Sequence, residues 1–77
     1  MVTVKLFAQL RPHFGTDAVA VEARTVAGLR LALDALCPRA APLAARSRVA
    51  VNLAFVGDDY AVTPADEVAL IPPVSGG

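Results

Sequence analysis

The 77-residue sequence contains one cysteine, no tryptophan and only four aromatic residues, three Phe and one Tyr. A single cysteine excludes an internal disulfide, and it excludes a zinc or iron–sulfur site held by several thiolates of one chain. Because 56% of the residues are nevertheless hydrophobic, the interior must be filled by Val, Leu and Ala. A chain of this length has room for one core, so we expect a single domain over residues 1–77.

Charge imbalance and long apolar runs are also missing. Seven Lys and Arg balance seven Asp and Glu, which removes the basic footprint expected of a protein that binds nucleic acid or anionic membrane. No apolar run approaches the roughly 20 residues that span a bilayer, and the sequence starts without a basic leader followed by an apolar stretch. We therefore expect no nucleic-acid or membrane partner and, given the lone cysteine, a cytoplasmic location.

Groups that usually carry catalysis or bind metal are few and scattered. His13 is the single histidine, and it stands beside Pro12 in an expected turn, which favours a solvated loop residue over a ligand or base. Cys37 precedes a proline at an expected helix end and is interpreted as a small buried hydrophobe. Asp58 and Asp59 are adjacent, as in a turn, whereas paired catalytic carboxylates face each other across a cleft. The sequence predicts no metal site, no permanently bound cofactor and no complete active site.

Two strands are expected near the start. Residues 2–7 alternate with period two, so that Val2, Val4 and Leu6 share one face of a strand and Phe7 lies on the other. A turn-rich segment follows, and "AVAVEA" predicts a second strand. We expect these two strands to form a hairpin.

One amphipathic helix is expected in the middle of the chain. Thr25 can cap its start, because a threonine hydroxyl accepts a hydrogen bond from the first helical turn. Pro38 ends it, since the residue before a proline is pushed out of the helical region. Apolar residues recur between these two positions at spacings of three and four and predict one buried stripe. The stripe consists of Val26, Leu29, Leu33 and Leu36.

The second half predicts a short helical turn in "APLAARS", one buried strand in "RVAVNLAF" and a final strand in "EVALI", with turns at "GDD" and "TPAD". Val68 and Leu70 of the final strand are expected to point inward. The order ββαββ predicts an α+β fold of the β-grasp type, a mixed sheet curled around one main helix. If the first and last strands are central neighbours, the chain end leaves from a rigid element.

The ending "PPVSGG" predicts an extended tail. Pro72 and Pro73 restrict φ and favour a stiff exit from the last strand, so we expect a flexible tail over about residues 72–77. Gly76 and Gly77 leave no side chain near the terminal carboxylate, which is ionised at neutral pH. Such a carboxylate is unreactive until a leaving group is attached, but it is slim enough to enter a narrow active site of a partner.

Several segments together carry a family resemblance that covers nearly the whole chain. "VKLFAQLRPHFGTDAVAVE", "TVAGLR", "RVAVN" and "DEVALIPPVSGG" resemble the small subunits of molybdopterin synthase, which are ubiquitin-like sulfur carriers. The opening "FAQLR" and the ending "PPVSGG" are specific in combination, whereas a terminal diglycine alone is shared with ubiquitin and with thiamine-pathway carriers. Ala65 departs from the glycine that is frequent in the turn before Asp66, which concerns the turn and leaves the tail unaffected.

The resemblance implies chemistry at the Gly77 carboxylate. A ubiquitin-activating-like adenylyltransferase would use ATP to adenylate it, and a sulfurtransferase would supply the sulfur that turns it into a thiocarboxylate. The tail residues Pro73, Val74, Ser75 and Gly76 would insert into the large synthase subunit, in a 2:2 heterotetramer, where sulfur passes to a cyclic pterin precursor. This chain would then be a sulfur-donating, non-catalytic subunit.

Candidate partner contacts lie near the strand ends. Phe7 and Ile71 fall on the outward parity of their strands, and exposed apolar residues on neighbouring strands can mark a docking site. Phe55 shares its parity with Leu53 and is predicted to lie in the core, while the resemblance alone puts a partner contact there. Arg11 matches the arginine of "FAQLR" and is either a partner contact or a solvated loop charge.

Two other functions remain open. A ubiquitin-like modifier would form an amide between the diglycine and a lysine of a target protein. A thiamine- or tRNA-type sulfur carrier would use the same loaded tail for a different acceptor, although thiamine-pathway carriers are generally shorter and lack the "FAQLR" opening and the double proline.

Overall fold

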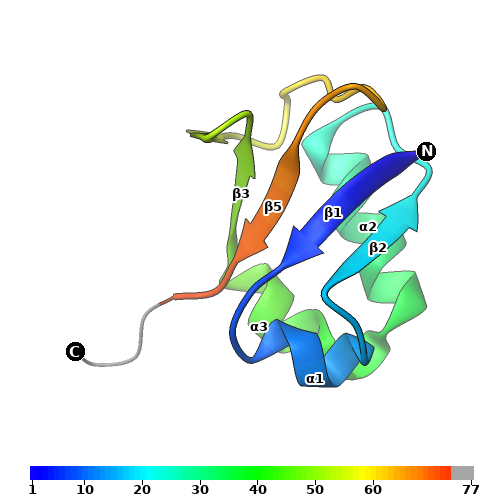
Figure 1. Ribbon diagram of the computed structural model, residues 1–77, viewed down its shortest axis with the longest axis vertical. Helices are drawn as coiled ribbons and strands as arrows, with labels where there is room; N and C mark the ends of the chain where they lie inside the picture. Colours follow the sequence, from blue (N-terminus) through cyan, green and yellow to red (C-terminus); the bar gives the residue numbers. More distant parts are fainter. Residues whose placement is uncertain (74–77) are drawn as a thin grey trace.

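A five-stranded mixed sheet lies against α2 in the computed structural model, which describes residues 1–73. Figure 1 shows α2 behind β1 and β2, with α1 and α3 near the ends of β1 and β5. The opposite side of the sheet carries no helix in this part of the chain. The strands are β1 Val2–Leu6, β2 Ala18–Val21, β3 Arg48–Val51, β4 Ala54–Val56 and β5 Val68–Ile71, and the helices are α1 Leu10–Phe14, α2 Val26–Leu36, the 3₁₀ helix η1 Pro38–Ala40 and α3 Ala41–Ala45.

The first and last strands pair in the middle of the sheet. The strand order is β2-β1-β5-β3-β4. β1 and β5 are parallel, with Val4 opposite Val68 and Leu6 opposite Leu70, and the other three pairings are antiparallel. The predicted β1–β2 hairpin, the central placement of the terminal strands and the β-grasp arrangement are therefore confirmed.

The core between the sheet and α2 is aliphatic, as the shortage of aromatic residues predicts. Alternate residues of β1 are buried, and so are Val68 and Leu70 of β5. Complete burial of one such side chain contributes about 1.5–3 kcal/mol. The side chains with no exposed surface are those of Val4, Leu10, Val26, Leu29 and Leu70.

Helix α2 begins and ends where the sequence predicts. The backbone N–H of Gly28 donates to the Thr25 hydroxyl at 3.1 Å, and the helix ends at Leu36, before Pro38. The prediction that Leu36 belongs to the buried stripe is wrong, because the helix ends beside the edge strand β2 and Leu36 stays 56% exposed there. Within residues 1–73, every helix is too short or too polar to cross a membrane.

Arg30 joins α2 to the segments that follow it. Its guanidinium donates to the carbonyl oxygens of Ala44 at 2.9 Å and Ser47 at 2.8 Å, and its Nε donates to Asp58 at 3.2 Å. The last carbonyl groups of a helix have no partner within the helix. Arg30 supplies that partner for α3 and holds the start of β3 against the helical layer.

A five-residue helix lies within the segment predicted to be a turn. Leu10 begins α1 and is fully buried, and Gly15 ends the helix at φ +73°. A left-handed residue is a common helix terminator, and glycine adopts it without strain. Five residues that include Pro12 are too few to show a helical period in the sequence.

The segment predicted to be one buried strand is a hairpin. Val51 lies opposite Ala54, so Asn52 and Leu53 form a two-residue turn, with φ values of +52° and +71°. Positive φ at both central positions matches the right-handed twist of the two strands and is the usual geometry of such tight hairpins. The prediction of a single strand over "RVAVNLAF" is therefore wrong.

Leu29→Ala should destabilise the domain strongly, because Leu29 is fully buried and its truncation leaves a cavity. We expect a loss of about 2–5 kcal/mol in the free energy of unfolding measured by urea denaturation. Leu31→Ala is the matched control on the same helix: Leu31 is 71% exposed, and a change within about 0.5 kcal/mol is expected. Equal losses in the two variants would contradict the assignment of the helix faces.

Candidate docking face

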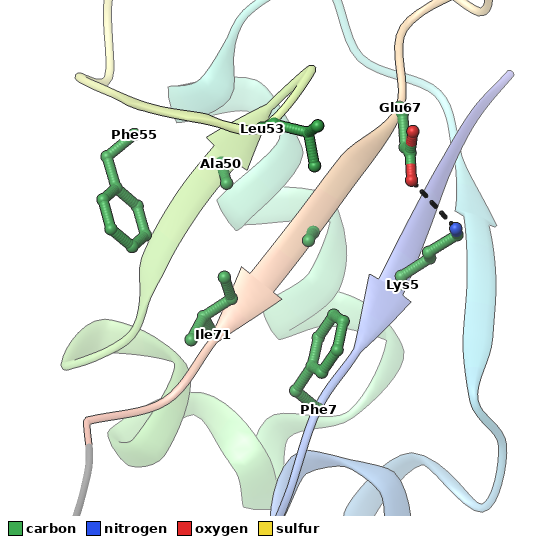
Figure 2. Close-up of a pocket in the computed structure, with 8 residues that line it drawn as sticks. Lys5, Phe7, Ala50, Leu53, Phe55, Glu67 and Ile71 are labelled. Atoms are coloured by element: carbon green, nitrogen blue, oxygen red, sulfur yellow. Dashed lines mark hydrogen bonds and ion pairs between the residues drawn. The ribbon is translucent and has the colours of Figure 1, made fainter.

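The sheet face opposite the helices holds a shallow apolar hollow of about 250 Å³. Its floor is formed by Ala50 of β3 and Ala69 of β5, which lie opposite each other in the sheet. Because both side chains are short, the larger side chains around them stand above the floor (Figure 2). We call this hollow and its rim the docking face, and its apolar rim consists of Phe7, Leu53, Phe55 and Ile71.

The rim is unusually exposed for large apolar side chains. Phe7 is 38% exposed, Phe55 is 50% exposed and Leu53 is 91% exposed, while Ile71 is half-buried. A contiguous apolar patch of this kind marks an interaction surface more often than single exposed residues do. The outward orientation predicted for Phe7 and Ile71 is confirmed.

The prediction that Phe55 lies in the core is wrong, and the turn explains why. In one continuous strand, residues 50 and 55 would point to opposite faces. The two-residue turn instead places Phe55 directly opposite Ala50, and cross-strand partners share a face. Phe55 therefore points to the same side as Ala50, into the docking face, and Leu53 stands at the tip of the turn (Figure 2).

Three hydrogen bonds to Asn52 hold this turn in place, and a fourth orders the segment that it contacts. The backbone N–H of Asn52 donates to the carbonyl of Glu67 at 2.8 Å, and the N–H of Glu67 donates to the Asn52 side-chain oxygen at 2.9 Å. The Asn52 amide nitrogen donates to one oxygen of Asp66 at 3.1 Å, and the N–H of Thr63 donates to the other at 2.8 Å. The hairpin is thus tied to the segment that leads into β5. The asparagine at 52 was the available signal for this turn, because Asn tolerates positive φ better than most residues.

The two hydrogen bonds that the Asp66 carboxylate accepts lower the pKa of Asp66 below its ordinary value of 3.8. The main cause is the Thr63 N–H, and the Asn52 amide adds to it, because both donors favour the ionised carboxylate.

Charged side chains flank the apolar rim. Lys5 and Glu67 form an ion pair at 3.0 Å on the β1 side of the hollow. Arg11 donates through Nε to the carbonyl of Leu6 at 3.2 Å and lies 3.9 Å from Asp17. Arg11 is therefore engaged with its own loop, and its pairing with a partner stays a prediction.

The chain leaves the sheet next to the docking face. Ile71 ends β5 on this face, Pro72 is buried and Pro73 is exposed. Pro72 thus belongs to the packed body, although the predicted tail includes it. In Figure 1 the chain turns away from the sheet over Pro72 and Pro73. The other predicted tail residues, Val74, Ser75, Gly76 and Gly77, lie outside the described residues.

Within residues 1–73, the remaining candidate groups form no second site. Cys37 is partly buried, and its thiol donates to the carbonyl of His13 at 3.2 Å. In the described part of the chain, His, Cys, Asp and Glu side chains do not gather in threes that could hold a metal ion.

Asp66→Asn should remove a pH-dependent part of the stability. Because the folded-state pKa is lowered, the stabilisation by Asp66 is complete above 3.8 and is lost as the pH falls through the folded value. We expect the advantage of the wild type over Asp66→Asn to shrink in urea titrations run from about pH 6 to about pH 3. Asp59→Asn is the control, since Asp59 takes no part in this network, and parallel pH profiles for wild type and Asp66→Asn would refute the assignment.

Known proteins share both the length and the fold of this chain. The molybdopterin synthase sulfur carrier subunit of Escherichia coli K12 is 42% identical over 81 aligned positions, which cover all of both chains. Small archaeal modifier protein 1 (SAMP1) of Haloferax volcanii is 30% identical, with a TM-score of 0.84 over 99% of this chain and 98% of that one. A chain of the BexX/CysO complex of Amycolatopsis orientalis is 26% identical, with a TM-score of 0.82 over all of both chains. The ThiS family model matches residues 4–77, and the chain belongs to the ThiS family.

Proposed function

We propose that this chain is the sulfur carrier subunit of a molybdopterin synthase, with the Gly77 carboxylate as the sulfur-bearing group. The observation that carries this proposal is the end-to-end similarity, at 42% identity, to the Escherichia coli sulfur carrier subunit. The sequence ending "PPVSGG" and the exposed apolar face beside the tail exit support it.

The proposed chemistry takes place on other proteins. On an activating enzyme, a Gly77 carboxylate oxygen attacks the α-phosphorus of ATP, and pyrophosphate leaves to give an acyl adenylate. A sulfur nucleophile at the oxidation level of hydrosulfide, delivered through a sulfurtransferase, then attacks the carbonyl carbon. AMP leaves with the former carboxylate oxygen, and a thiocarboxylate remains. Two loaded carriers supply the two sulfurs of one dithiolene, and hydrolysis returns each tail to the carboxylate.

The contribution of this chain is positioning. Ile71 belongs both to the docking face and to β5, so a partner that covers this face also holds the base of the tail. The four residues after Pro73 reach at most roughly 14 Å when fully extended. Docking by Phe7, Phe55 and Ile71 therefore determines which active site the terminal carboxylate can enter.

The proposed partners are the large synthase subunit, in a 2:2 heterotetramer, and the activating enzyme. The likeness to a chain of the BexX/CysO complex supports a role in which this fold acts while docked on another protein. ATP belongs to the activating enzyme in this scheme.

Intact-mass measurement tests the proposal. After incubation with ATP, the activating enzyme and a sulfur source, we expect the wild-type chain to exchange one oxygen for one sulfur at Gly77. Deletion of Gly77, or addition of one alanine after it, should abolish sulfur donation to the pterin precursor. Both variants should melt at the wild-type temperature, because glycine has no side chain to bury and the change falls at the chain end. Absence of exchange in the wild type, with a known carrier loaded in parallel, would overturn the proposal.

The likeness to SAMP1 favours protein modification as the second candidate function. A modifier would give slower-migrating conjugates of the tagged chain in cell lysate, resistant to thiols because an amide links Gly77 to a lysine, and the Gly77 deletion would abolish them. For a sulfur carrier we expect no such conjugates. A thiamine- or tRNA-type carrier would be distinguished by the acceptor that takes the sulfur from the loaded chain.

A further inference from the structure

The charges around the docking face are unequally compensated. On the β1 side, the ion pair between Lys5 and Glu67 neutralises itself. On the opposite side, Arg48 lies over the ring of Phe55, with the guanidinium carbon 3.8 Å from the ring centroid. Among the described residues, Arg48 has no carboxylate within ion-pair distance. One positive charge at this rim is therefore left without a counter-charge from residues 1–73.

The position of Arg48 follows from the sheet register. Arg48 begins β3 and lies opposite Ile71 of β5, while Phe55 of the paired strand β4 lies opposite Ala50. The stacked pair thus stands beside the last residue of β5, where the chain leaves the sheet. Arg48 is consequently part of whatever surface a partner covers together with the docking face.

Stacking prepares the guanidinium for one kind of partner group. A guanidinium that lies over an aromatic ring keeps its N–H groups directed outward in its own plane, where a carboxylate can accept two parallel hydrogen bonds. The contact with Phe55 also restricts the side chain before any partner arrives, so less conformational entropy is lost on binding.

Because Arg48 lies over Phe55 of the rim, a partner that covers the hollow would also remove water from Arg48. A buried charge without a partner is strongly unfavourable, whereas a buried charge with a hydrogen-bonded counter-ion is tolerated. A partner that covers only the apolar rim would leave Arg48 buried without a counter-ion. A partner with a carboxylate at the β3–β4 rim satisfies it, and no second carboxylate is required beside Lys5, which Glu67 already neutralises.

We propose that Arg48 determines partner specificity at the docking face by pairing with an Asp or Glu of the partner protein. The partner presents this carboxylate next to an apolar side chain that fills the hollow above Ala50 and Ala69. The inference rests on the proposed function only in the choice of probe, which is the purified large synthase subunit of the same organism.

The test is calorimetric titration of the full chain with that subunit. Arg48→Leu should raise the Kd at least about tenfold, because a tenfold change corresponds to about 1.4 kcal/mol and the loss of one partner of a desolvated ion pair costs at least that much. Arg39→Leu removes the same charge from an exposed position in η1 and should change the Kd by less than about threefold. If the face binds through apolar contacts alone, Arg48→Leu will bind as well as the wild type or better, and that result would overturn the proposal.

Two further measurements distinguish an ion pair made by Arg48 from a non-specific effect of removing a positive charge. Arg48→Lys keeps the charge and loses the planar fork, so its Kd should fall between those of wild type and Arg48→Leu. Raising the salt from about 0.05 M to about 0.5 M should weaken the wild type more than Arg48→Leu. Parallel salt dependences of these two proteins would count against the ion pair. Thermal melting should show both variants folded, since Arg48 is exposed.

Failure of this inference is distinguishable from failure of the proposed function. If the wild type is loaded with sulfur and binds the large subunit while Arg48→Leu binds equally well, only the role of Arg48 is wrong. If the wild type binds the subunit in neither its loaded nor its unloaded form, the docking proposal and the role of Arg48 both fall. The oxygen-for-sulfur exchange at Gly77 is read separately, by mass.

Discussion

The parallel pairing of β1 with β5 is the constraint on which the rest of the structure depends. It joins residues separated by most of the chain, Val4 to Val68 and Leu6 to Leu70, and both Val4 and Leu70 are fully buried. The two hairpins extend the sheet on either side of this pair. Because β5 is central and bonded on both edges, its last residue has a well-defined position. The base of the tail and the residues that β5 contributes to the docking face, Ala69 and Ile71, therefore belong to one rigid element.

The sequence predicts those elements whose own pattern is long and regular. β1 and α2 show periods of two and of three to four, and their apolar faces are the ones buried, apart from Leu36 at the end of α2. The sequence does not reveal the β3–β4 hairpin, because Asn52–Leu53 lacks the glycine that usually marks so tight a turn. The two-residue turn also changes which positions face the core: odd-numbered residues in β3 and even-numbered residues in β4. The place of Phe55 depends on that change. The stacking of Arg48 depends on cross-strand register, which a single sequence does not contain.

Hydrogen bonds, and not burial of side chains, position the tip of the β3–β4 hairpin. Asn52 bonds to Glu67 in both directions and to Asp66, so the tip is held without help from the core. The rim residues Leu53 and Phe55 can remain in water and still keep one geometry. A surface arranged before contact loses little conformational entropy on association.

Leu53 sets the stability of the free domain against the apolar surface that it presents. A leucine at φ +71° is held in a conformation that costs L-residues roughly 1–2 kcal/mol, and at 91% exposure it gains almost nothing from its own fold in return. Glycine would relieve the strain. The leucine therefore lowers the stability of the free domain in exchange for apolar surface at the rim, and only a contact outside the domain could recover that free energy.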